Sequence, residues 1–203
     1  MTEFLTTTTA TAVGPNLPQR MGGRLWKPML AMALMAFPIG FVIHLVKANQ
    51  IADSGEATTI AGLQHVGTGV MWIGFLAVFA AVSFAVAKIL GEFRTGGSVV
   101  QEATGSKVVT LRMPNTVRLF IGTMMMGVML ILGSVIVHFV IGAGLLGGDA
   151  AALEGLESAS IRLEAFRRLG TVLYLFGIAF GLGTIIHVIR FQTIRIRQLP
   201  EPA

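Results

Sequence analysis

The chain has 203 residues, of which 54% are apolar and 12% charged, and its mean hydropathy is +0.77. A soluble domain of this composition would expose far too much apolar surface, so the sequence indicates an integral membrane protein. The formal net charge of +5 does not indicate nucleic-acid binding, because the basic residues lie where the topology of membrane insertion places them.

The first segment, residues 1–23, is rich in Thr and has no apolar core ahead of Arg20 and Arg24. A secretory signal peptide contains such a core, so we do not expect this segment to be one. Its composition instead predicts a disordered cytoplasmic tail.

Four apolar stretches follow, and each reaches the roughly 20 residues that a bilayer crossing requires. They cover residues 27–47, 63–90, 117–146 and 169–189. The stretches that exceed the minimum are expected to tilt or to extend beyond the lipid. The fold predicted is therefore an all-α integral membrane protein with four transmembrane helices.

The segment between the second and third spans, residues 95–115, contains Gly96, Gly97 and Gly105. It also contains two short runs rich in β-branched residues, at 98–100 and 107–110. Short runs of this kind separated by glycine are typical of paired strands, so we predict a small hairpin here.

The loop after the third span, residues 147–168, shows helical spacing at 150–156 and at 161–166. We expect both pieces to lie along the outer membrane surface. Beyond the fourth span, residues 190–197 continue its helix into the headgroup layer, where arginine side chains reach toward water. Pro200 ends this helix, which leaves residues 198–203 as a C-terminal tail.

The distribution of basic residues predicts the orientation. Eleven of the fifteen lie within or beside the N-terminal segment, the loop 95–115 and the end of the fourth span. Only four lie within or beside the loops 48–62 and 147–168, which carry six acidic residues. By the positive-inside rule both termini lie in the cytoplasm and these two loops face outward. We expect a multi-pass protein of the cell inner (cytoplasmic) membrane.

The sequence also contains an internal repeat. Arg24-Leu25-Trp26, Met32, Met35 and His44 recur 94 residues later as Arg118-Leu119-Phe120, Met126, Met129 and His138. Val66-Gly67-Thr68 and Gly74 recur 103 residues later as Leu169-Gly170-Thr171 and Gly177. We infer that one helix pair was duplicated, giving residues 24–94 and 116–197 on either side of the loop 95–115. Equivalent residues would then face each other across a pseudo-two-fold axis.

His44 and His138 are the first candidates for a cofactor site, because they occupy equivalent positions in the two repeats. Each lies 20 residues after the first arginine of its repeat, which is roughly 30 Å along a helix. Both therefore lie near the outer boundary, where two imidazoles at equal depth could hold haem b as axial ligands. The alternative is structural, with each imidazole bonded to headgroups or to a neighbouring helix.

His65 begins the second span on the same outer side, and its repeat equivalent is Arg168. Arg168 together with Arg167 could neutralise haem propionates, or His65 could join His44 and His138 as a third ligand of copper. The alternative is that His65 caps the helix at the interface and that both arginines pair with acidic residues of the loop.

His187 lies near the cytoplasmic end of the fourth span, and its repeat equivalent is Phe84. No other histidine shares its depth, so we expect a structural role. The methionines of the first and third spans lie in their inner halves, away from the outer histidines, and are expected to pack against apolar surfaces. They are Met29, Met32, Met35, Met124, Met125, Met126 and Met129.

No nucleophile elbow, phosphate loop or zinc motif is present in the sequence, so we do not expect the chain to be catalytic on its own. The chain has no cysteine, so any metal would need His, Met or carboxylate ligands. Carboxylates within the spans, which are typical of coupled transporters, are also missing.

The four-span architecture resembles that of the small helical anchor and cytochrome b subunits of bacterial membrane complexes. The resemblance covers only the spans and includes no diagnostic motif. It implies a subunit of a larger membrane redox complex, of respiratory or monooxygenase type, in contact with other membrane-protein subunits. Haem b, copper and a cofactor-free assembly role remain open, as does a small transporter.

Overall fold

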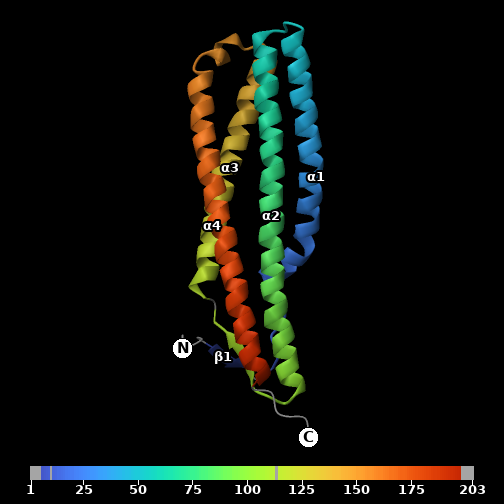
Figure 1. The fold of residues 1–203 in the computed structure, drawn as a ribbon, viewed down its shortest axis with the longest axis vertical. Coiled ribbons are helices and arrows are strands. Elements are labelled where there is room, and N and C mark those ends of the chain that lie inside the picture. The colour runs from blue at the N-terminus through green and yellow to red at the C-terminus, as the bar shows by residue number, and fades with distance from the viewer. Residues whose placement is uncertain (1–5, 10, 113, 198–203) are drawn as a thin grey trace. The chain divides into compact units, whose positions relative to one another are not determined.

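The computed structural model of the protein describes residues 6–9, 11–112 and 114–197. It contains four long helices, which Figure 1 labels α1 (Leu17–Ala52), α2 (Ala57–Ala103), α3 (Asn115–Leu146) and α4 (Leu156–Arg197). Each is long and apolar enough to cross a membrane, which confirms the predicted helical membrane fold with four spans. The predicted C-terminal tail, residues 198–203, lies outside the described residues.

The chain divides into two compact units, and every long helix contributes to both. Unit 1 comprises Met1–Trp26, Ala81–Thr123 and Phe176–Ala203, and unit 2 comprises Lys27–Ala80 and Met124–Leu175. Unit 1 includes the two short strands β1 (Thr6–Thr9) and β2 (Val108–Leu111), and unit 2 includes the 3₁₀ turn η1 (Ala150–Leu153).

Small residues allow α1 and α2 to pack closely in unit 2. A Cβ added at Gly74 of α2 would lie 3.0 Å from the ring of Phe37, and one added at Gly67 would lie 3.0 Å from Cε1 of His44. Glycine at such positions lets two apolar helices approach without displacing side chains.

Glycines also allow α3 and α4 to pack closely. A Cβ at Gly127 would lie 3.0 Å from the carbonyl oxygen of Gly170, and one at Gly170 would lie 2.7 Å from Cγ1 of Ile131. One turn beyond Gly170, the ring of Tyr174 is fully buried and stacks on Phe79 of α2, with ring centroids 4.3 Å apart. These contacts join α2, α3 and α4 in the part of each helix that belongs to unit 2.

The N-terminal segment of unit 1 differs from the predicted disordered tail. Residues 6–9 form β1, which pairs antiparallel with β2, and the hydroxyls of Thr7 and Thr110 share a hydrogen bond of 2.8 Å. Helix α1 begins at Leu17, where the Asn16 side chain accepts a hydrogen bond from the Gln19 amide and caps the first turn.

The segment 95–115 also differs from the predicted hairpin. Only its second β-branched run forms a strand, whereas residues 98–100 lie within α2. Ser98 is fully buried in that helix, where its hydroxyl donates to the carbonyl of Thr95. The helix ends at Ala103, two residues before Gly105, which takes the left-handed conformation with φ of 66°. Packing therefore overrides the local strand preference of the first run.

The loop between α3 and α4 is shorter than predicted. Its first piece is the turn η1, which is capped by the Asp149 side chain accepting from the Ala151 amide. The second predicted piece, residues 161–166, is not a separate surface helix, because α4 already begins at Leu156. Gly155, with φ of 73°, redirects the backbone just before it.

Candidate functional site

A polar cluster lies in unit 2, formed by two buried histidines and a half-buried arginine, one from each of three helices. His65 of α2 and His138 of α3 are only 3% and 4% exposed, and their Nδ1 atoms lie 2.8 Å apart. Arg167 of α4 contacts the second nitrogen of His138 through its Nη1. We refer to His65, His138 and Arg167 as the His–His–Arg cluster.

The contacts of His138 determine where the imidazole protons lie. A guanidinium has only N–H donors, so Nε2 of His138 must accept the hydrogen bond from Arg167. A His138 ring that accepts at Nε2 carries its proton on Nδ1 and donates it to Nδ1 of His65. His65 in turn carries its own proton on Nε2. Both imidazoles are therefore neutral in this arrangement, and the positive charge of the cluster resides on Arg167.

Arg167 is held in place by groups on two helices. Its guanidinium lies over the ring of Trp72, 5.3 Å from the ring centroid, which is cation–π geometry. Trp72 follows His65 by seven residues on α2, so the two project from the same side of that helix. The carbonyl of Arg167 also accepts a hydrogen bond of 2.9 Å from the hydroxyl of Thr171.

The charge of Arg167 has no carboxylate partner among the described residues. The nearby acid, Glu164, instead forms an ion pair of 2.5 Å with Arg168, whose side chain is largely exposed. The Nε atom of Arg167 is buried and has no hydrogen-bond partner within the described part of the chain. Arg167 therefore has a buried N–H donor that no acceptor in the described residues receives.

His44 does not belong to this cluster. Its ring lies against Gly67 of α2. Gly69, two residues further along α2, faces α3 instead, because a Cβ added at Gly69 would meet side chains of α3 and would lie 3.5 Å from Cβ of His138. Residues two apart in an α-helix project about 200° from each other. Helix α2 therefore stands between His44 and His138, and the structure brings His138 together with His65 instead.

These contacts bear on the predicted cofactors. Both ring nitrogens of His138 are engaged within the chain, and His44 approaches α2 from the other side. Among the described residues no group of three or more His, Cys, Asp or Glu side chains is placed to hold a metal ion. Haem b between His44 and His138, and copper held by His44, His65 and His138, remain predictions that these contacts do not support. His187 belongs to unit 1.

Two aromatic residues of the site were not anticipated from the sequence. Trp72 lies under Arg167, and the buried Tyr174 follows Arg167 by seven residues on the same side of α4. The hydroxyl of Tyr174 is buried without a hydrogen-bond partner in the described residues. The seven-residue spacings His65 to Trp72 and Arg167 to Tyr174 were the available signal, since such pairs share one helix face.

The fold and this cluster define the class of the protein, a multi-pass helical membrane protein in which two buried histidines and a half-buried arginine form a hydrogen-bonded cluster. The chain matches no protein-family model, no curated protein and no solved structure in the comparisons made with it.

Proposed function

We propose that this protein is a non-catalytic subunit of a larger redox complex in the cytoplasmic membrane, with both termini in the cytoplasm. Its His–His–Arg cluster would receive an acidic or carbonyl group that another subunit, or a cofactor held by another subunit, presents to it. The observation that carries the proposal is the buried Nε–H of Arg167, which has no acceptor among the described residues.

Ionisable groups among apolar helices are costly in free energy and usually serve a purpose. A buried N–H without an acceptor costs free energy, because it has lost its hydrogen bond to water and gained none in return. Within the described residues, Arg167 contacts neutral partners, His138 and Trp72. An acceptor from outside the chain would complete the site.

The imidazole pair supports a role in a redox complex. One proton lies between the Nδ1 atoms of His65 and His138, 2.8 Å apart. Histidine chains within membranes commonly form proton relays. A cluster of this kind is suited to exchanging a proton with a redox group beside it.

Exposed apolar helix faces support a role within an assembly. On α3, Met125, Met126 and Met129 are 54%, 59% and 63% exposed. Such a face contacts either lipid or the helices of another protein, and methionine adapts its shape to an irregular partner. Haem held by this chain is not part of the proposal, because α2 stands between His44 and His138.

The test is purification of the complex from native membranes in mild detergent, with a reduced-minus-oxidised spectrum of the sample and identification of the accompanying subunits. Arg167→Gln removes the charge, and Arg168→Gln is the matched control on the adjacent, exposed arginine. We expect the wild type and the control to co-purify with redox subunits, and Arg167→Gln to lose them.

Two outcomes would overturn the proposal. One is a chain that purifies alone, in the wild type as in Arg167→Gln, and carries substrate across liposome membranes. The other is a b-type spectrum in the isolated chain that disappears in His44→Ala, which would restore the haem assignment.

A further inference from the structure

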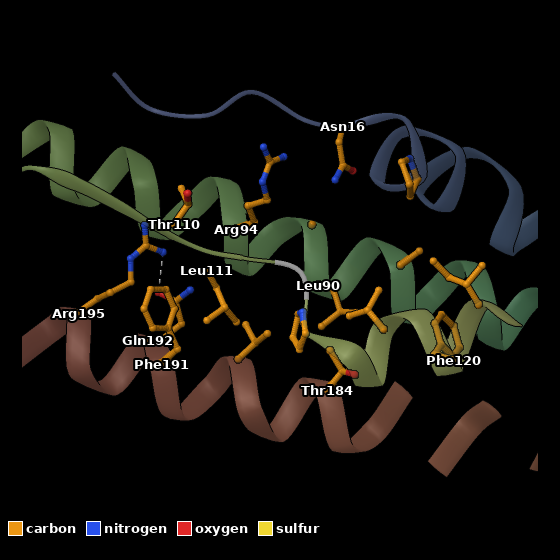
Figure 2. Close-up of a pocket in the computed structure, with 17 residues that line it drawn as sticks. Asn16, Leu90, Arg94, Thr110, Leu111, Phe120, Thr184, Phe191, Gln192 and Arg195 are labelled. Carbon is orange, nitrogen blue, oxygen red and sulfur yellow. Dashed lines mark hydrogen bonds between the residues drawn. The ribbon is translucent and has the colours of Figure 1, made fainter. Parts of the chain in front are cut away.

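Unit 1 contains a cavity that the proposed function does not use. Its volume is about 390 Å³, and its walls come from α2, α3, α4, β2, the first turn of α1 and the residue before it (Figure 2). This volume lies within the range of small-molecule sites, about 300–1,000 Å³. The cavity is therefore large enough to hold one flexible apolar chain.

The lining is apolar along most of its length. The α4 residues that line it run from Thr184 to Arg195, roughly 16 Å along the helix axis. Val188 and Phe191 lie between them, and Leu90 of α2 and Phe120 of α3 line the cavity from the other helices. The hydroxyl of Thr184 already has a hydrogen-bond partner, because it donates to the Phe180 carbonyl.

The charged groups of the lining are of one sign. Arg94 and Arg195 both line the cavity, and no acidic residue does. Arg195 is only 3% exposed, and neither arginine forms an ion pair with a carboxylate of the described residues. A buried guanidinium without an anion is an unusual arrangement, because buried charges are normally paired.

The guanidinium of Arg195 is held in a fixed orientation by two neutral amides. Its Nε and Nη2 donate to Oε1 of Gln101 at 2.9 and 2.6 Å, and its Nη1 donates to Oε1 of Gln192 at 3.2 Å. An arginine has five N–H donors, so one hydrogen on Nη1 and one on Nη2 remain for a ligand. Two N–H groups in a planar fork suit the oxygens of a phosphate or carboxylate.

We propose that this cavity binds an anionic membrane lipid, with one acyl chain along the apolar walls and the acidic headgroup at Arg195 and Arg94. Arg195 lies beyond the predicted fourth span, residues 169–189, at the level expected for lipid headgroups. Gln101 is a positioning residue, since it orients the guanidinium. The proposal is independent of the proposed function, because the His–His–Arg cluster belongs to unit 2.

The test measures lipid binding to the full-length protein in detergent by native mass spectrometry. The probes are phosphatidylglycerol, zwitterionic phosphatidylcholine and oleate, each added to delipidated protein. We expect phosphatidylglycerol to bind at least about tenfold more tightly than phosphatidylcholine. If oleate binds in place of phosphatidylglycerol and its binding also depends on Arg195, the site is the same and the anionic ligand is a free fatty acid.

Three variants complete the experiment. Arg195→Gln should weaken binding of the anionic probe at least about tenfold, and Arg195→Lys should retain part of it, because an ammonium keeps the charge but not the fork. Ala87→Phe leaves both arginines in place and should block the chain, since Ala87 lines the cavity. Arg197→Gln, an exposed arginine that does not line the cavity, is the control.

The proposal is overturned if phosphatidylcholine binds as tightly as phosphatidylglycerol and oleate. It is also overturned if Arg195→Gln and Ala87→Phe bind the anionic probe as Arg197→Gln does. Thermal unfolding of each variant shows that it is folded, and retained binding by Arg195→Lys separates a lost charge from a lost fold.

Discussion

His65 and His138 share a hydrogen bond between their Nδ1 atoms, although the two residues are 73 positions apart and lie on different helices. Each neutral imidazole offers one donor and one acceptor, so this bond uses the donor of one ring and the acceptor of the other. Arg167 occupies the remaining acceptor of His138. One buried side chain thus links α2, α3 and α4, and His138 is the residue on which the cluster depends.

Replacing His138 with leucine should destabilise the protein more than any other single change in the cluster. Leucine fills much of the space but leaves Arg167 and His65 without their partner, and each unpaired buried group costs about 1–3 kcal/mol. We expect a loss of about 3 kcal/mol in the free energy of unfolding, measured by denaturation in detergent.

His44→Leu is the matched control for that measurement. His44 is half-buried and lies outside the cluster, so its replacement should cost less than about 1 kcal/mol. Equal losses for the two variants would mean that the bond between His65 and His138 does not stabilise the fold.

The close approach of α3 and α4 predicts a specific sensitivity to an added methyl group. Gly127→Ala would place a Cβ 2.9 Å from Cδ2 of Tyr174 and 3.0 Å from the carbonyl of Gly170, so the two helices would have to separate. Overpacking of this kind typically costs about 1–3 kcal/mol. The expected result is a lower melting temperature in detergent.

Gly133→Ala provides the control on the same helix, because a Cβ there would meet nothing within 4 Å. Alanine favours helix over glycine, so this variant should be as stable as the wild type or slightly more so. A melting temperature that falls equally in both variants would argue against close packing at Gly127.

The four spans could be predicted from the sequence because their apolar runs are long and uninterrupted, but the helix ends could not. Helix α2 was expected to end by residue 94, before the loop 95–115, and continues to Ala103. Gly96, Gly97 and the valines after them favour a turn or strand locally. The bonds of Gln101 to Arg195 of α4 stabilise the helical conformation there, and a partner that far along the chain leaves no local signal.

The sequence predicts how far along each span the site residues lie, but not the direction in which their side chains point. The sequence predicts that His44, His65 and His138 lie near the outer ends of their spans. It does not show which face of α2 meets which neighbour, because a helix that is apolar all round has no polar side to fix its rotation. The repeat suggested that His138 faces His44, whereas the packing at Gly67 and Gly69 directs them to opposite sides of α2.

The hydroxyl of Tyr174 offers a test of whether the site is complete within this chain. The residue is fully buried with its ring stacked on Phe79, and the hydroxyl has no partner among the described residues. Tyr174→Phe keeps the ring and removes an unsatisfied group, so the free energy of unfolding of the isolated chain should stay the same or rise by about 1 kcal/mol. Tyr174→Ala, which also loses the ring, should cost about 3–5 kcal/mol. A clear loss in Tyr174→Phe would show that the hydroxyl has a hydrogen-bond partner within the isolated chain.

The predicted orientation is tested by labelling single cysteines, which is straightforward because the natural chain has none. Thr104→Cys lies between α2 and β2, and Ser158→Cys lies near the start of α4, and both positions are exposed. The positive-inside rule places Thr104 in the cytoplasm and Ser158 outside. A maleimide that does not cross membranes should label Ser158→Cys in cells whose inner membrane is intact, and Thr104→Cys only after that membrane is broken. The reverse pattern would place both termini outside, and the cavity beside Arg195 would then face the outer leaflet.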